Sequence, residues 1–318
     1  MTEFPALLDV FKARNRIAPY VTRTPLHHYP QLDRLLGARV FVKHENHQSL
    51  GAFKIRGALN VISQLTDAEK SRGVVCASTG NFGQGIAFAA SVFGVHAEVF
   101  VPVGANPDKC EAMRGLGAEL AFHGSNFDEA RAECERHAEA EGSVYIHSAD
   151  EPRLIPGVAT YALEIFEDLP DVDVIVVPVG AGSGACGTCI VADSINPDVR
   201  VIGVQSEAAP AAFRSWQSGE IVEAAMGTVA EGLSTSVGFE LTQQIMRALL
   251  ADFVLVTDEE LVRAVGLYME TTHNLAEHAG AAPLAAAIRN AESLQGKNVV
   301  LVMSGGNISR EHLGGVLA

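Results

Sequence analysis

A lysine next to an aromatic residue is the first feature of this sequence that could do chemistry. The segment Ser49 to Asn60 reads SLGAFKIRGALN, and Phe53 and Ile55 flank Lys54 within it. A lysine in partly apolar surroundings loses its proton more readily than one in water, and the free amine is a nucleophile. A single lysine is more often a solvated surface charge, so this interpretation needs support from other segments.

A second segment has the residue types of an anion site. Ser78-Thr79-Gly80-Asn81-Phe82-Gly83-Gln84 follows the apolar run 74–77 and precedes a predicted helix over 85–93. Hydroxyls, side-chain amides and free backbone N–H groups at a helix start bind anions such as a carboxylate. An ordinary capped turn needs fewer polar side chains, so the pattern favours a ligand.

Two glycine-containing loops follow later apolar runs. Gly180-Ala181-Gly182-Ser183-Gly184 has alternating glycines, whose backbone N–H groups can converge on a phosphate at the start of a helix near Ala185. The same loop also satisfies a dinucleotide-binding pattern, with Glu207 as its acidic residue, and by itself cannot decide between the two. The loop Ser304-Gly305-Gly306-Asn307 either reverses the chain or presents the Ser304 hydroxyl at a strand end.

Short β-branched runs alternate with alanine-rich helical stretches, which predicts βαβ units and parallel sheet. Ligands in open α/β sheets bind where strands end and helices begin, so the loops above are expected to meet. The predicted strands are 40–43, 74–77, 99–102, 120–122, 174–179, 201–205 and 299–303.

Composition excludes several classes of protein. With 48% hydrophobic and 19% charged residues, the chain of 318 residues is an ordinary globular protein with room for two domains. Its net charge of −15, from scattered acids, argues against nucleic acid as a partner. We find no signal peptide or membrane span, and five cysteines fit reduced thiols in a cytoplasm. The close pairs Cys186/Cys189 and His44/His47 lack further ligands, so we predict no zinc site.

Taken together and in this order, these segments resemble the serine/threonine dehydratase and serine racemase group of fold-type II pyridoxal-phosphate (PLP) enzymes. The resemblance implies an α/β fold of two interlocked open-sheet domains, similar to the tryptophan synthase β subunit. We expect a large domain from 1–51 and 149–318 and a small one from 52–148. Besides the four loops, the segments that carry the resemblance are Arg16-Ile17-Ala18-Pro19-Tyr20, Arg23-Thr24-Pro25-Leu26, Glu151-Pro152 and Pro156-Gly157; the most specific is Phe53-Lys54-Ile55-Arg56-Gly57-Ala58.

The resemblance also implies a role for each site residue. Lys54 would carry the cofactor as an imine and then act as general base, with Phe53 against the pyridine ring. Asn81 would bind the 3-hydroxyl, and Ser304 would face the ring nitrogen. The cofactor phosphate would lie on Gly180, Ala181, Gly182, Ser183 and Gly184, and the substrate carboxylate on Ser78, Thr79, Asn81 and Gln84.

Departures from the group's pattern refine these expectations. Phe82 stands where histidine is common, which makes the pocket more apolar. Gln205 and Ala211 replace carboxylates that hold a divalent cation in some members, so we predict no metal, although Glu207 could compensate. Thr79 aligns with the serine that serves racemases as an acid. The chain ends soon after the Ser304 loop, so no C-terminal regulatory domain is expected.

The function implied by the resemblance is elimination of water from a small β-hydroxy amino acid, giving a 2-oxo acid and ammonia. Serine, threonine, phenylserine and 3-hydroxyaspartate all remain open as substrates. An amino-acid racemase on the same scaffold is the alternative, and a catalytically silent binding module is a more remote one. The resemblance also implies a homodimer.

Overall fold

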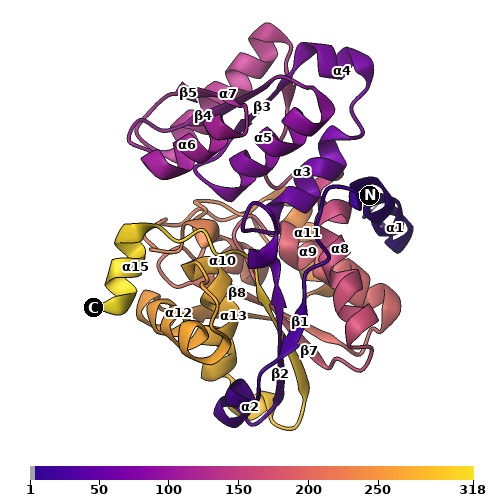
Figure 1. The fold of residues 1–318 in the computed structure, drawn as a ribbon, viewed down its shortest axis with the longest axis vertical. Helices are drawn as coiled ribbons and strands as arrows, with labels where there is room; N and C mark the ends of the chain where they lie inside the picture. Colours follow the sequence, from indigo (N-terminus) through magenta and orange to yellow (C-terminus); the bar gives the residue numbers. More distant parts are fainter. Residues whose placement is uncertain (1–3) are drawn as a thin grey trace.

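The computed structural model describes residues 4–318 and contains two separate sheets (Figure 1). The larger sheet has six strands in the order β1-β2-β10-β7-β8-β9, and the smaller has four in the order β5-β4-β3-β6. The expected α/β fold with two open sheets is confirmed. The strands of the larger sheet are β1 (Leu26–His28), β2 (Arg39–His44), β7 (Val174–Pro178), β8 (Arg200–Ser206), β9 (Asp252–Val256) and β10 (Asn298–Met303).

The two faces of the larger sheet are buried against different helices. Along β7, Ile175 and Val177 belong to one apolar core, whereas Val174 and Val176 belong to another, as the alternation of side chains along a strand requires. Both faces are therefore covered, which is usual for parallel strands. The first core includes residues of α1 (Leu7–Ile17), α8 (Leu154–Asp168), α9 (Ser183–Ile195), α10 (Ala211–Ser218) and α11 (Glu240–Leu249). The second includes residues of α2 (Pro30–Leu36), α12 (Asp258–Thr272), α13 (His278–Arg289) and α14 (Ala291–Leu294).

The smaller sheet is built from one continuous stretch of chain between β2 and α8. Its strands are parallel, and the core beside them includes residues of α3 and α5, among them Ile55 and Ile86. We call this stretch the four-stranded unit and the remainder the six-stranded unit. The four-stranded unit comprises α3 (Lys54–Ile62), α4 (Asp67–Arg72), β3 (Val74–Ala77), α5 (Asn81–Phe93), β4 (Ala97–Val101), α6 (Pro107–Gly115), β5 (Glu119–Phe122), α7 (Phe127–Glu141) and β6 (Val144–Tyr145).

All the runs predicted as strands are strands, and every pairing is parallel except that of β1 with β2. Strands β1, β6 (Val144–Tyr145) and β9 were not predicted from the sequence. The exact domain limits at 52 and 148 stay a prediction. Within residues 4–318, no helix is long and apolar enough to cross a membrane.

Candidate active site

A cavity of about 330 Å³ lies between the two units, and the four loops singled out from the sequence meet in it. The four-stranded unit contributes residues 77–82, Lys109 and Phe127 to its lining, and the six-stranded unit contributes 180–184 and Ser304. Three of these loops follow the carboxyl ends of β3, β7 and β10, where parallel sheets place their ligand sites. The expectation that these loops converge is confirmed.

Lys54 is the first residue of α3, and its ammonium group has few partners. Its Nζ donates to the Ser183 hydroxyl at 3.3 Å and lies 4.8 Å from the centre of the Phe53 ring. Burial lowers the pKa of Lys54 from 10.5 to about 8, and the nearby Glu277 carboxylate offsets only part of that effect. The lysine can therefore lose its proton close to neutral pH and act as a nucleophile or base.

The Ser304 loop holds the start of α3 in place. The Phe53 N–H donates to the Ser304 carbonyl at 3.1 Å, and Ala52 forms a bridge with Gly305. Ser304 itself is buried and lines the cavity. The loop thus serves both the lysine and the cavity wall.

The Ser78 to Gln84 segment differs in two ways from its prediction. Helix α5 begins at Asn81 rather than Gly85, so the second half of the segment is the first helical turn. The Ser78 hydroxyl accepts from the N–H groups of Gly80 at 3.2 Å and Gly83 at 2.8 Å, so it is occupied within the loop. Thr79, Gly80 and Asn81 line the cavity, whereas Gln84 is buried and is not among its described lining residues.

The glycine loop after β7 has room for a ligand but not for side chains. A Cβ atom on Gly180 would lie 2.1 Å from the carbonyl oxygen of Gly232, and Gly182 has a φ of +99°. Helix α9 starts at Ser183, so the free N–H groups of its first turn adjoin the cavity. Such a start of a helix suits a phosphate, and the loop therefore fits the phosphate of PLP.

Asn81 is fixed by two neighbours that the sequence analysis did not assign. Its Nδ2 donates to Glu277 Oε1 at 2.8 Å, and its Oδ1 accepts from Asn307 Nδ2 at 2.8 Å. Burial raises the pKa of Glu277, whereas the Lys109 ammonium and the hydrogen bond from Asn81 act to lower it. One amide hydrogen of Asn81 remains for a hydroxyl, so the residue fits its predicted contact with the cofactor.

Three further charged or polar cavity residues were also missed, Lys109 on α6, Glu231 on the short helix η2 (Glu231–Leu233) and Glu277 just before α13. Lys109 and Glu231 form an ion pair between the two units. In the sequence, their segments look like ordinary solvated helix ends. Only the tertiary arrangement brings them to the cavity.

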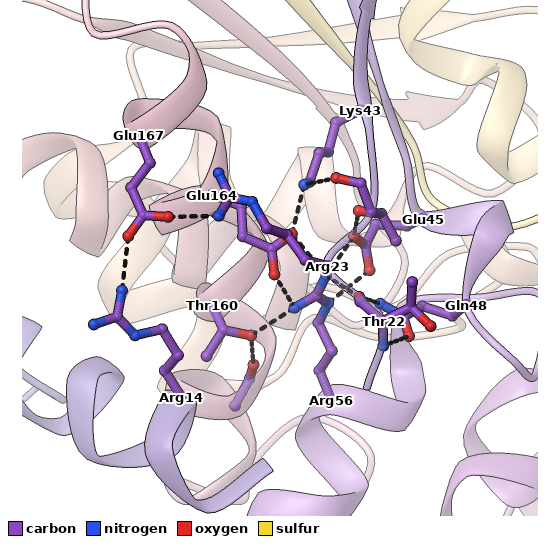
Figure 2. A network of polar contacts seen from close by, with 12 residues as sticks. Arg14, Thr22, Arg23, Lys43, Glu45, Gln48, Arg56, Thr160, Glu164 and Glu167 are labelled. Atoms are coloured by element: carbon purple, nitrogen blue, oxygen red, sulfur yellow. Dashed lines mark hydrogen bonds and ion pairs between the residues drawn. The ribbon is translucent and has the colours of Figure 1, made fainter. Parts of the chain in front are cut away.

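Near Lys54 a buried cluster of charges anchors helix α3, and we call its members Lys43, Glu45, Arg56 and Glu164 the Arg56 cluster (Figure 2). Arg56 donates to Glu45 at 2.8 and 2.9 Å and to Glu164 at 2.7 and 3.0 Å. Lys43 donates to Glu164 at 2.5 Å. These contacts join β2, the short helix η1 (Glu45–His47), α3 and α8, so the end of α3 that carries Lys54 is held against the six-stranded unit.

The residues considered for a divalent cation make protein contacts instead. The side-chain oxygen of Gln205 accepts from the N–H of Phe213 at 3.0 Å, and Glu207 pairs with Arg289 at 2.9 Å. Among residues 4–318 there is no group of three or more acidic, histidine or cysteine side chains arranged to hold a metal. Cys186 and Cys189 are buried as free thiols.

Comparisons with known proteins agree with this geometry. The family model "Pyridoxal-phosphate dependent enzyme" matches residues 17–305. The chain is 40% identical to an L-threonine ammonia-lyase of Thermotoga maritima, over 95% of this chain and 75% of that one. It is 38% identical to the catabolic L-threonine dehydratase of Escherichia coli, over 95% and 93% of the two chains.

Solved structures give the same result. Maize serine racemase superposes with a TM-score of 0.93 at 31% identity, covering 99% of this chain and 97% of that one. A threonine deaminase of T.th. superposes with a TM-score of 0.90 at 35% identity, covering 96% and 99%. The resemblance inferred from the four loops is confirmed, and with it the cofactor, so the dinucleotide reading of residues 180–184 is set aside. The chain belongs to the family of pyridoxal-phosphate-dependent enzymes.

Proposed function

We propose that the protein is an ammonia-lyase that eliminates water from L-threonine and yields a 2-oxo acid and ammonia. Elimination from a β-hydroxy amino acid agrees with the curated relatives, which are named for threonine and match nearly the whole chain. The observation that carries the proposal is Lys54, a partly buried lysine with few partners, whose pKa of about 8 suits proton transfer inside the cavity.

When bound, PLP supplies the electron sink that makes the substrate Cα proton acidic. Lys54 would hold the cofactor and take that proton. The backbone around Thr79 and Gly80, which lines the cavity at the start of α5, would bind the substrate carboxylate. The β-hydroxyl takes up a proton and leaves as water. The released enamine tautomerises to an imine, which water hydrolyses to the 2-oxo acid and ammonia. The walls from both units enclose the reacting atoms during the elimination.

Ser304 would be the residue that faces the ring nitrogen of the cofactor, and it lines the cavity. Its hydroxyl, unlike a carboxylate, would not hold that nitrogen protonated. The cofactor would then supply a weaker electron sink, which favours elimination of a leaving group. We propose Phe53, Asn81 and residues 180–184 as the remaining cofactor contacts.

A substrate panel tests the proposed activity. Purified protein loaded with PLP is incubated with L-threonine, L-serine, phenylserine and 3-hydroxyaspartate, and 2-oxo acid and ammonia are measured together. We expect threonine to give the highest kcat/KM. Phe82 packs beside the cavity, so phenylserine is the informative competitor. No 2-oxo acid from threonine or serine would refute the proposal.

Racemisation is the second candidate because serine racemases share the fold closely. Thr79 lines the cavity where a serine acts in racemases by the resemblance. Its β-methyl restricts χ1, so its hydroxyl is less free to be aimed at Cα. We predict that elimination exceeds inversion by about tenfold or more, since an aligned acid contributes roughly 10²- to 10⁴-fold. Chiral chromatography of the residual substrate of wild type and Thr79→Ser measures this, and the variant should racemise relatively more.

We further propose a homodimer that works in the cytoplasm, both on the resemblance to the family. Sedimentation at assay concentration tests the dimer. A fully active monomer would contradict it.

A further inference from the structure

One ion pair spans the cavity between the two units. Lys109 on α6 and Glu231 on η2 line the cavity, and their side chains are 12% and 37% exposed. Substitution of Glu231 leaves the Lys109 ammonium at the cavity wall without this carboxylate, and neither residue belongs to an apolar core. The pair can therefore be altered without disturbing the cores of either unit.

Lys109 lies beside the loop proposed for the substrate carboxylate. A Cβ atom added to Gly80 would be 3.8 Å from Lys109 Nζ. An ammonium at this place would attract any anionic group of a substrate that reaches past the loop. Glu231 weakens that attraction because its carboxylate already forms an ion pair with the ammonium.

The charges around the cavity are few. Among the described lining residues the cations are Lys54 and Lys109, the anions are Glu231 and Glu277, and there is no arginine. A substrate's α-carboxylate is served by the start of α5, but a second carboxylate would meet the two glutamates and a lysine that is already paired. Repulsion of that kind is how binding sites reject wrong partners.

We propose that Glu231 is a specificity-determining residue: by pairing with Lys109, it makes the cavity reject β-hydroxy amino acids that carry a second carboxylate. This inference rests on the proposed elimination activity. It assigns Lys109 as the cation that would accept such a carboxylate once Glu231 no longer holds it.

The test compares two substrates in one enzyme. For wild type and Glu231→Gln, kcat/KM is measured for L-threonine and for 3-hydroxyaspartate, and the ratio of the two values is reported. We expect the substitution to raise the ratio in favour of 3-hydroxyaspartate by about tenfold, because it removes one anion and frees one cation. Glu231→Ala should shift the ratio in the same direction, so the inference does not depend on one variant.

A double-mutant cycle shows whether Lys109 is responsible. In a Lys109→Met background, Glu231→Gln removes only repulsion and offers no cation, so the ratio should rise by clearly less than in the wild-type background. Equal shifts in the two backgrounds would overturn the role given to Lys109. The matched control is Glu292→Gln, which removes an exposed negative charge on α14 away from the cavity lining and should leave the ratio unchanged.

Failure of this inference can be told from failure of the proposed function. Wild type that releases 2-oxo acid from threonine, together with an unchanged ratio in both Glu231 variants, would overturn only the inference. Wild type that acts on neither substrate would refute the proposed function.

Discussion

Lys54 and Arg56 stand two residues apart at the start of α3 and have opposite surroundings. Arg56 is fully buried, whereas Lys54 is partly buried at the cavity wall. Arg56 donates to two carboxylates and to the Thr160 hydroxyl, and these acceptors raise its pKa above the ordinary value although burial alone would lower it. Lys54 has one hydroxyl at 3.3 Å and a cavity in front of it, and burial lowers its pKa to about 8.

The contrast shows that two cations on one helical turn can have different roles, one structural and one reactive. A buried cation whose donors are all used is fixed and inert, whereas one left short of partners is ready to release a proton. The Arg56 cluster balances two cations with two anions and joins four elements. Because it holds the start of α3, Lys54 can be reactive without having partners that hold it in place.

The largest effect is expected from Lys54→Ala. The variant should lose turnover by at least about 10³-fold, because the group that holds the cofactor and moves the proton is gone. Its urea midpoint should stay close to that of wild type, since Lys54 has few contacts to lose. The exposed Lys12→Ala is the control and should keep full activity. If Lys54→Ala kept its turnover, Lys54 would not be the reactive lysine.

Arg56→Met should mainly affect stability. Removing the guanidinium leaves Glu45 and Glu164 buried with only Lys43 to balance them, which costs about 3–5 kcal/mol in comparable buried pairs. The urea midpoint of Arg56→Met should fall clearly below that of Lys54→Ala. The midpoint of Arg56→Lys should lie between these two, because one ammonium cannot make all the hydrogen bonds of the planar guanidinium. If Arg56→Met were as stable as wild type, the anchoring role of the cluster would be wrong.

The pH dependence of cofactor attachment sharpens the comparison. Only the neutral amine of Lys54 can attack, so the attachment rate of PLP to cofactor-free protein should rise through pH values near 8 and then level off. An unperturbed lysine would give a rise that continues toward its ordinary pKa of 10.5. Stopped-flow absorbance across pH 6 to 10 (roughly the range over which such an amine titrates) measures the rate. A rise that continues to the highest pH would show that burial does not set the pKa.

The smallest effect is expected from removal of divalent metals. Gln205 and Glu207 are engaged with Phe213 and Arg289, so we expect activity to survive dialysis against a strong chelator. Activity is assayed before and after dialysis, with Mg²⁺ or Ca²⁺ added back. Complete loss that the ions restore would show that Glu207 or backbone oxygens bind a cation.

Much of the fold was predictable because the central strands are apolar runs bounded by glycine, serine or asparagine. Strands β1 and β6 are too short to show the alternation of apolar and polar residues that marks a strand. Strand β9 was overlooked although its sequence, DFVLV, is largely apolar. The start of α5 was misplaced because Asn81 and Gln84 suit a loop as well as a first helical turn.

The site was predictable where chemistry depends on local sequence, as at Lys54 and the glycine loop 180–184. Lys109, Glu231 and Glu277 were not, because each reaches the cavity only through the packing of one unit on the other. The ion pair of Arg56 with Glu164 could not be predicted for the same reason, because Glu164 lies more than a hundred residues further along the chain.

Chemical reduction of the PLP-loaded protein, followed by peptide mapping, tests most directly which lysine is reactive. Borohydride fixes the cofactor to the lysine that holds it. Three lysines compete near the site, Lys54 with few partners, Lys43 in the Arg56 cluster and Lys109 in its pair with Glu231. We predict that the modified peptide contains Lys54 alone. Modification at Lys43 or Lys109, with Lys54 left free, would contradict the account.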